Sequence, residues 1–211
     1  MINSERNFPR ILIFDYDGVI ADSLEIYSKL FVEVCKKYGF KGVNSKEEFI
    51  SLFDKNLYES MMEMGVKEED IKRILEDKRF LISKNALKPR IFDGIKKVME
   101  RLSISNNIFI ITSNISPVVK EFLDENGMDF YEEVLGADRG LSKVTKINLI
   151  KSNYVSNEIF YIGDTKGDIL EGKSAGVKTI AITWGWHSLE KLKECNPDFI
   201  VNNPVELLRW I

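Results

Sequence analysis

Short runs of consecutive apolar residues alternate along this chain with segments in which apolar residues recur every three or four positions. The apolar runs lie at 10–14, 107–111, 158–162, 177–182 and 198–201. Such runs are typical of strands buried on both faces, whereas the three-to-four spacing marks the apolar face of a helix. Strands that alternate with helices predict an α/β fold with a parallel sheet.

Two of the expected helices cover 95–102 and 118–123. For the second helix, Ser116 followed by Pro117 predicts an N-cap and a first turn, because serine caps helices and proline fits the first helical position. Gly127 predicts the end of the same helix, since glycine readily adopts the left-handed conformation that follows a last turn. These local signals fix where single helices begin and end.

The alternation is interrupted between residues 22 and 88, where several helical segments follow one another. The first runs from Leu24 to Tyr38 before Gly39, and later ones cover 47–53, 58–64 and 68–82. A single crossover helix is expected after a first strand, so we predict an all-helical cap domain, 22–88, inserted into a core made of 1–21 and 89–211. We expect hinges near 20–23 and 87–90.

The charge balance limits the partners. The chain has 211 residues, of which 44% are hydrophobic and 30% charged, and its formal net charge is −3. The predicted cap carries 13 acidic and 13 basic side chains. Without a positive excess, we expect no nucleic acid and no membrane as a partner.

Cysteine usage and the ends of the chain favour a cytoplasmic location. Cys35 and Cys195 lie far apart, with no spacing typical of a zinc site or a disulfide framework. Residues 1–10 contain no apolar signal core, and no stretch reaches the roughly 18 apolar residues of a membrane span. A reducing compartment is therefore expected.

Polar side chains that can do chemistry follow the predicted strands. They are Asp15-Tyr16-Asp17-Gly18, Thr112-Ser113-Asn114 and Gly163-Asp164-Thr165-Lys166-Gly167-Asp168, joined by Ser142-Lys143 before a later helix. Loops at the carboxyl ends of parallel strands converge on one crevice, where ligands bind. We expect carboxylates, a hydroxyl and an amine to meet there.

Carboxylates gathered at a sheet edge repel one another and call for a cation. Mg²⁺ is the natural candidate, since it takes oxygen ligands from one or two carboxylates and keeps waters or phosphate in its other positions. We expect Asp164 to ligate it. Asp168, one helical turn further on, is expected to hold Asp164, a metal-bound water or the lysine rather than to ligate.

Two aspartates suggest the reaction. Asp15, at the tip of its strand, can attack phosphorus as a nucleophile and form an aspartyl phosphate. Asp17, which we expect Gly18 to leave mobile, can protonate the departing oxygen and later take a proton from water. The alternative is that the pair only caps a turn, where aspartate is common.

Phosphoryl transfer needs donors around the equatorial oxygens. The Thr112 hydroxyl, the amides of Ser113 and Asn114 and the Lys143 ammonium are the candidates. Thr112 can instead cap its turn, and Lys143 can be a surface lysine. Lys146 is a competitor that spacing does not exclude.

In this order, Asp15-x-Asp17-Gly18, Thr112, Lys143 and Gly163-Asp164-x-x-x-Asp168 resemble the four motifs of the haloacid dehalogenase superfamily. The resemblance spans about residues 10–205, including the helical insert, and 183–186 and 197–199 resemble the closing segments of phosphoglycolate-phosphatase-like members. It implies a Rossmann-like three-layer core with strand order 5-4-1-2-3 and a magnesium site at Asp15, Asp164 and the Asp17 carbonyl.

The resemblance implies a Mg²⁺-dependent phosphatase acting on a small phosphorylated metabolite, as a monomer or a homodimer. Asp17 argues against the dehalogenase and phosphonate-cleaving branches, which lack an acid at that position. A sugar-phosphate mutase of the β-phosphoglucomutase type remains an alternative, although such mutases usually carry a histidine soon after the first motif. A catalytically idle binding or regulatory member is a second alternative.

The only histidine, His187, follows Trp184-Gly185-Trp186. A lone histidine without a paired acid is weak support for a catalytic role, so we expect it on a surface loop. Aromatic residues after a core strand more often fill space between layers than line a pocket, and we expect this of Trp184 and Trp186.

Overall fold

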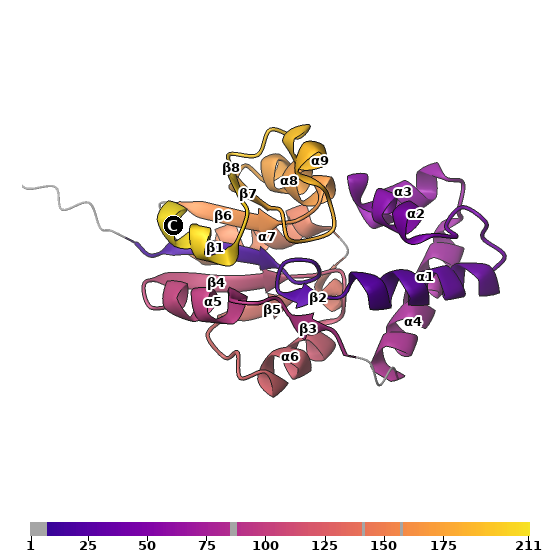
Figure 1. Ribbon diagram of the computed structural model, residues 1–211, viewed down its shortest axis with the longest axis horizontal. Helices are drawn as coiled ribbons and strands as arrows, with labels where there is room; N and C mark the ends of the chain where they lie inside the picture. The colour runs from indigo at the N-terminus through magenta and orange to yellow at the C-terminus, as the bar shows by residue number, and fades with distance from the viewer. Residues whose placement is uncertain (1–7, 85–87, 141, 157) are drawn as a thin grey trace, which may run out of the picture.

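The computed structural model describes residues 8–84, 88–140, 142–156 and 158–211 of the chain. Its centre is a parallel sheet of six strands in the order β5-β4-β1-β6-β7-β8 (Figure 1). The strands are β1 (Arg10–Asp15), β4 (Asn106–Ile111), β5 (Glu133–Leu135), β6 (Ile159–Gly163), β7 (Lys178–Ile182) and β8 (Phe199–Val201). The expected α/β class is thus confirmed.

The strand order differs from the expected one by a single strand. Counted along the chain within this sheet, the order reads 6-5-4-1-2-3 from the β8 edge, so β8 extends the expected five-strand arrangement. The hydrophobic pattern did not predict β5, which has only three residues and pairs with β4 alone. A strand that short leaves no readable run of apolar residues.

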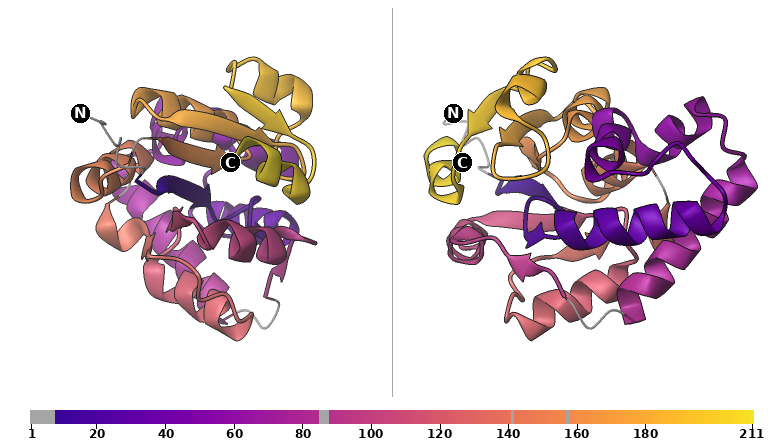
Figure 2. Two further views of the ribbon diagram at one scale, coloured as in Figure 1. Left: turned by 90° about the vertical axis from the view of Figure 1, so that its left-hand side faces the viewer. Right: turned by 45° about the vertical axis from the view of Figure 1, so that its right-hand side comes forward.

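Helices cover both faces of the sheet, and the alternation of side chains in β1 divides the core between them. Leu12 and Phe14 pack with α5, α6 and α10, whereas Ile11 and Ile13 pack with α7 and the end of α8. The covering helices are α5 (Ile95–Ser103), α6 (Ser116–Glu125), α7 (Lys143–Asn153), α8 (Lys166–Ser174), α9 (Leu189–Lys193) and α10 (Leu207–Trp210). The two faces give three layers (Figure 2).

One helix start differs from its prediction. Helix α6 begins at Ser116, with Ile115 as its N-cap, so the expectation that Ser116 caps the helix is wrong. The Ser116 hydroxyl donates instead to Asp138 Oδ1 over 2.9 Å and accepts the Gly136 amide over 2.8 Å, which ties α6 to the loop after β5. The end is as predicted, with Gly127 left-handed at φ +61° after the last turn.

Four helices lie between β1 and α5, beyond the end of the sheet (Figure 1). They are α1 (Leu24–Lys37), α2 (Lys46–Ser51), α3 (Leu57–Glu63) and α4 (Glu68–Lys84), with a 3₁₀ turn η1 (Leu52–Asp54) after α2. Phe31, Phe49, Met61 and Ile71 are buried in a separate apolar cluster that these helices build. We refer to them together as the helical insert.

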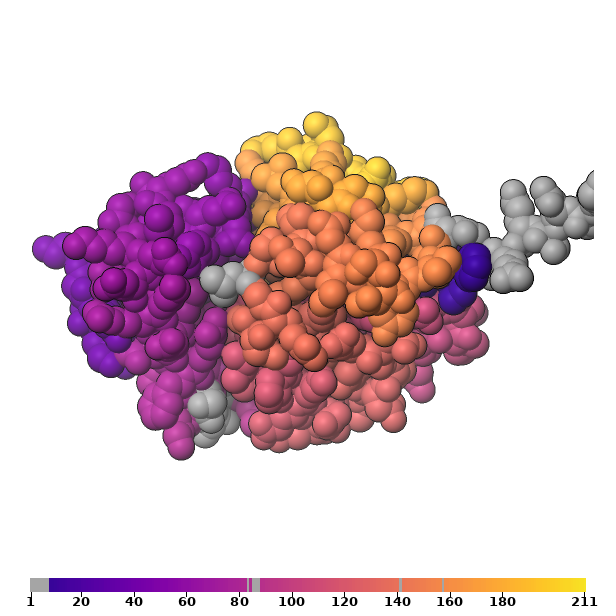
Figure 3. Space-filling model, turned by 180° about the vertical axis from the view of Figure 1, so that it is seen from behind, coloured from indigo at the N-terminus to yellow at the C-terminus, as the bar shows by residue number. Residues whose placement is uncertain are grey.

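Two short strands form the base of the helical insert. β2 (Ala21–Asp22) pairs antiparallel with β3 (Arg90–Ile91), so the chain enters and leaves the helical insert side by side. The expected hinge at 20–23 lies in and around β2, while part of the other, at residue 87, falls outside the described residues. In space-filling view the helical insert and the sheet domain meet along a broad seam (Figure 3).

Short 3₁₀ turns complete the chain, η2 (Ala137–Arg139) after β5 and η3 (Pro204–Glu206) before α10. Within the described part of the chain, no helix combines the length and apolar character needed to cross a bilayer.

Candidate active site

The expected site residues meet at the carboxyl ends of β1, β4 and β6, under the helical insert. A cavity of about 20 Å³ at this place is lined by Asp15, Asp17, Ser113, Lys143, Thr165 and Trp186 and, from the helical insert, by Phe53, Leu57 and Lys78. Such a volume holds about one water molecule. The helical insert is therefore closed over the site.

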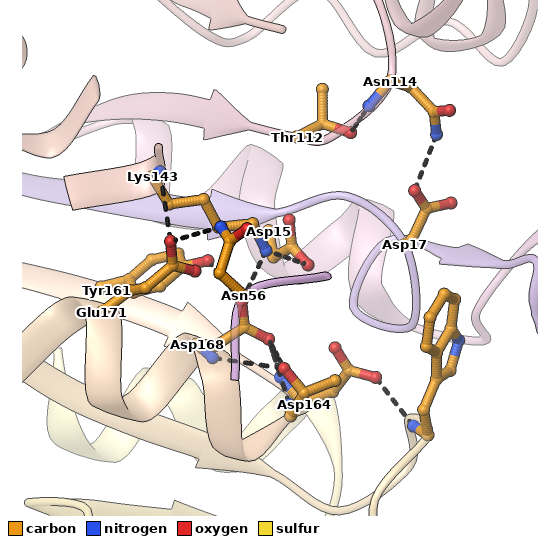
Figure 4. Close-up of polar contacts among 12 residues, drawn as sticks. Asp15, Asp17, Asn56, Thr112, Asn114, Lys143, Tyr161, Asp164, Asp168 and Glu171 are labelled. Atoms are coloured by element: carbon orange, nitrogen blue, oxygen red, sulfur yellow. Dashed lines mark hydrogen bonds and ion pairs between the residues drawn. The ribbon is translucent and has the colours of Figure 1, made fainter. Parts of the chain in front are cut away.

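Asp15 lies against Lys143. The Lys143 ammonium is 3.1 Å from Asp15 Oδ2 and 2.6 Å from Asp168 Oδ1, so it bridges the end of β1 and the first turn of α8 (Figure 4). Burial raises the pKa of Asp15 to about 8, although Lys143 opposes this. Burial acts to lower the pKa of Lys143, but the two carboxylates hold it well above its usual value. A buried carboxyl group and a buried ammonium group are thus in direct contact.

The structure distinguishes the two candidate lysines. Lys143 is only 8% exposed and contacts Asp15, so the surface-lysine alternative is wrong for it. Lys146 is buried as well, but its ammonium donates to the Thr112 carbonyl over 2.7 Å. Burial lowers the pKa of Lys146 to about 8. Lys146 therefore contacts the loop after β4, whereas Lys143 lies beside Asp15 in the candidate site.

One carboxylate oxygen of Asp164 has no hydrogen-bond partner among the described residues. Its Oδ2 accepts the Trp186 amide over 2.7 Å, whereas its buried Oδ1 has no hydrogen-bond partner among the described residues. Burial raises the pKa of Asp164 well above its usual value. Oxygens of Asp15, Asp164 and Asp168 lie within 4.8 Å of one another. A buried carboxylate oxygen without a donor fits a cation ligand.

The charges around the cavity favour a divalent cation. Five buried carboxylates act on three buried ammonium groups here, so the fully ionised set lacks two positive charges. The carboxylates are those of Asp15, Asp17, Asp164, Asp168 and Glu171, and the ammonium groups are those of Lys78, Lys143 and Lys146. A bound dication supplies the missing charge and allows the buried carboxylates to ionise.

Asp168 is fully occupied by protein donors. Its Oδ1 accepts from Lys143 and, over 2.7 Å, from the Tyr161 hydroxyl. Its Oδ2 accepts from the Thr165 amide and hydroxyl and from the Asp164 amide, at 3.0, 2.7 and 3.3 Å. Burial acts to raise the pKa of Asp168, but Lys143 and these donors lower it. Asp168 thus orients both Lys143 and the loop that carries Asp164.

Asp17 is held on both oxygens. Ser23 donates to Oδ1 and the Asn114 side chain to Oδ2, each over 2.7 Å. Burial raises the pKa of Asp17 to about 6, against the attraction of Lys78. The backbone amide of Asn114 donates to the Thr112 hydroxyl oxygen over 3.0 Å. Both the backbone and the side-chain N–H groups of Asn114 therefore donate within the protein.

Gly18 is not the source of mobility that the sequence suggested. It adopts φ +79°, and a Cβ on it would lie 2.0 Å from Asp164 Oδ2. Its amide donates to the Ala21 carbonyl over 2.9 Å, which closes the turn. Glycine is required here because the chain is left-handed and because the Asp164 carboxylate packs directly against the backbone.

The expectation of a surface position for His187 is wrong. The side chain is buried between the sheet domain and the helical insert, and the residue is 2% exposed. Its Nδ1 accepts the Lys166 amide over 3.0 Å, so its Nε2 carries the proton and donates to the Ile50 carbonyl, 3.2 Å away. It links α8 to α2 and does not line the cavity around Asp15.

The two tryptophans have different roles. Trp184 packs against the core and donates from its indole to the Val19 carbonyl over 3.2 Å, as expected for a residue that fills space. Trp186 lines the cavity and packs edge-on against Phe53, with ring centroids 4.8 Å apart. The sequence expectation is therefore right for Trp184 and incomplete for Trp186.

Three contributors were missed by the sequence analysis, namely Ser23, Tyr161 and Lys78. Only Lys78 had a readable signal. It lies on α4 four residues after Ile74 and seven after Ile71, so it occupies the buried, apolar face of its helix. From the helical insert, the segment around 53–58 supplies Phe53 and Leu57 to the cavity.

Residues 12–182 match the family model of the haloacid dehalogenase-like hydrolases. The chain belongs to this family. It is similar to a phosphoglycolate phosphatase from Vibrio parahaemolyticus, 26% identical over 96% of both chains, and to a pyrophosphatase from Listeria innocua, 23% identical over 93% of this chain and 94% of that protein.

The fold is shared with solved structures of the haloacid dehalogenase-like hydrolases. One from Streptococcus pneumoniae superposes with a TM-score of 0.77, at 22% identity, over 96% of this chain and 98% of that one. Phosphatases of the family depend on a metal, and this chain contains a buried acidic cluster made of Asp15, Asp164 and Asp168.

Proposed function

We propose that this hydrolase removes the phosphoryl group from a small phosphorylated metabolite, with Mg²⁺ as cofactor and through an aspartyl phosphate. The observation that carries the proposal is the meeting of Asp15, Lys143 and the unpartnered Asp164 Oδ1 at the end of the sheet. Neither a capped turn nor a binding module needs a buried carboxylate oxygen that no protein donor satisfies.

In the first half of the reaction, a carboxylate oxygen of Asp15 forms a bond to phosphorus while the bond from phosphorus to the ester oxygen breaks. Asp17 gives its proton to that departing oxygen. In the second half, water loses a proton to Asp17 and attacks phosphorus, which frees Asp15 and phosphate. The pKa of Asp17, near 6, suits a group that must both give and take a proton near neutral pH.

Mg²⁺ would be held by Asp15, Asp164 and, as the resemblance implies, the Asp17 carbonyl. When bound, it neutralises charge on the transferring phosphoryl group. The protein keeps this site ready, because Gly18 packs against Asp164 and the Trp186 amide fixes one of its oxygens.

Phosphate contacts are proposed for Lys143, Ser113 and the Thr112 hydroxyl. Lys143 is beside the nucleophile, and Ser113 lines the same cavity. Thr112 is buried, and although its oxygen accepts the Asn114 amide, the hydroxyl keeps its own proton to donate. For Asn114 we propose a positioning role, since its side chain holds Asp17.

The helical insert is proposed to be a cap domain, 22–88, that opens for substrate and closes during reaction. Closure excludes water while Asp15 attacks. The cavity of about 20 Å³ is too small for a phosphate ester, so entry requires the cap to lift. The paired β2 and β3 at its base are the proposed pivot.

The test is an assay of phosphate release from para-nitrophenyl phosphate and acetyl phosphate, with Mg²⁺ and with a chelator. We expect turnover only with Mg²⁺, and its loss in Asp15→Asn. Absence of turnover at every pH would instead favour a catalytically idle member. A sugar-phosphate mutase would isomerise its substrate without releasing an equal amount of phosphate. Ranking a panel of phosphorylated metabolites by kcat/KM then identifies the substrate.

A further inference from the structure

Lys78 is a buried cation that the proposed reaction does not use. It lies on α4 of the helical insert, is 5% exposed and lines the cavity opposite Asp15 and Lys143. Lysine is almost never buried unless it is paired, so its position calls for an explanation. Burial lowers its pKa, which reflects the cost of keeping a charge there.

The ammonium of Lys78 has weak partners. It lies over the ring of Tyr27, 5.0 Å from the centroid, and it is attracted by Asp17. Among the described residues, however, it donates no hydrogen bond, and Asp17 accepts from Ser23 and Asn114. Because Lys78 lines the cavity, its N–H donors are available to an anionic ligand bound there.

A second small hollow continues from the cavity along α4. It measures about 30 Å³ and shares Leu57, Lys78 and Ser113 with the cavity that contains Asp15. Arg79 also lines it, and burial lowers the pKa of that side chain. The leaving-group side of the site therefore presents two basic side chains on a single helix of the helical insert.

We infer that Lys78 binds a negative charge on the leaving group, and that the substrate is a small phosphate ester or anhydride whose leaving group is itself an anion. A carboxylate and a second phosphate present the same chemistry to an ammonium. The inference rests on the proposed function, because it assigns the reacting phosphoryl group to Asp15 and Lys143. The new element is that the helical insert selects substrates whose leaving group carries a negative charge.

Size supports the same class of substrate. Among the residues that line the cavity with Lys78, Phe53 and Leu57 offer only apolar surface. The cavities are small while the helical insert is closed over the site. A leaving group of two or three heavy atoms allows the helical insert to close again over the bound substrate, whereas a bulky leaving group keeps it open. For so small a leaving group, a charge close to Lys78 provides specificity.

The test compares matched pairs of substrates, with kcat/KM measured in the presence of Mg²⁺. Phosphoglycolate is paired with ethyl phosphate, and ethylene glycol bisphosphate with 2-hydroxyethyl phosphate, so that both members of each pair are phosphate esters of a primary alcohol and differ in the charge of the leaving group. We expect a preference of about 10- to 100-fold for the charged member of at least one pair, as for a hydrogen bond to a charged group. The pair that shows the preference identifies the anion as a carboxylate or a phosphate.

The variants are Lys78→Met, which keeps the length of the side chain, and Lys72→Met as a control on the exposed face of α4. We expect K78M to reduce the preference to less than about threefold and K72M to leave it intact. Lys78→Arg keeps the charge and should retain most of the preference, so it tests the role of charge even if K78M folds poorly.

Two results would overturn the inference while leaving the proposed function in place. One is equal activity of the wild type on the charged and neutral members of both pairs. The other is an equal loss in K78M on all four substrates, which would make Lys78 only a counter-ion that lowers the pKa of Asp17. If the wild type hydrolyses neither these compounds nor acetyl phosphate, the proposed function itself fails.

Discussion

Asp164 and Asp168 are buried and lie one helical turn apart, yet replacing each by asparagine should change stability in opposite directions. In Asp168→Asn, the charge that accepts from Lys143 over 2.6 Å and from Tyr161 over 2.7 Å is removed. Breaking a buried ion pair costs about 3–5 kcal/mol. At about 2–4 °C per kcal/mol for a chain of this size, the Tm should fall by about 6–20 °C.

Asp164→Asn should have the reverse effect in metal-free protein. Its Oδ1 has no partner among the described residues, and burial raises its pKa. A carboxyl with a raised folded-state pKa binds more protons when folded than when unfolded, so its contribution to stability falls as the pH rises above the unfolded value. Replacing it should gain about 1–3 kcal/mol of stability at pH 8 and less at pH 5.

The assay is thermal unfolding followed by circular dichroism at pH 5 and pH 8, with a chelator and then with Mg²⁺. Added Mg²⁺ should raise the Tm of the wild type and leave that of D164N nearly unchanged. Asp22→Asn, at an exposed position on β2, is the matched control. A D164N variant that is destabilised as strongly as D168N, or a D168N variant within about 2 °C of the wild type, would refute the assignment of roles.

Three further outcomes follow from the site. Asp15→Asn should lower turnover by about three orders of magnitude or more in a protein that still folds, and a variant that keeps most of its phosphate release would remove Asp15 as the nucleophile. In wild-type protein, Mg²⁺ should raise the Tm more at pH 8 than at pH 5. The pKa values of Asp15 and Asp17 are raised to about 8 and about 6, so the metal-free protein becomes less stable as the pH rises through that range. Equal increases in Tm at the two pH values would contradict this. Gly18→Ala should lower stability by about 3 kcal/mol or more, because its Cβ would collide with Asp164. Gly65→Ala, at φ +81° with open space around it, should lower stability by only about 1–2 kcal/mol. Equal losses of stability in the two variants would argue against the steric explanation.

The sequence was sufficient for the features that depend on neighbours along the chain. The apolar runs place β1, β4, β6, β7 and β8, because a strand buried on both faces must be apolar throughout. Since parallel strands end at one edge, the positions of Asp15, Thr112 and Asp164 at the ends of these runs already bring them to one crevice. The helical insert was predicted because several helical segments, rather than a single crossover helix, follow the first strand.

The tertiary structure decided which partner each polar group meets. Lys143 and Lys146 are both buried on α7, and only their directions in space give one to Asp15 and the other to the Thr112 carbonyl. The sequence around His187 predicts only a loop position, and its burial depends on the packing of α2 against it. Lys78 belongs to the site only because α4 lies over the strand ends. Burial patterns are local along the chain, whereas an ion pair or hydrogen bond depends on distances of a few ångströms between distant segments, which only packing sets.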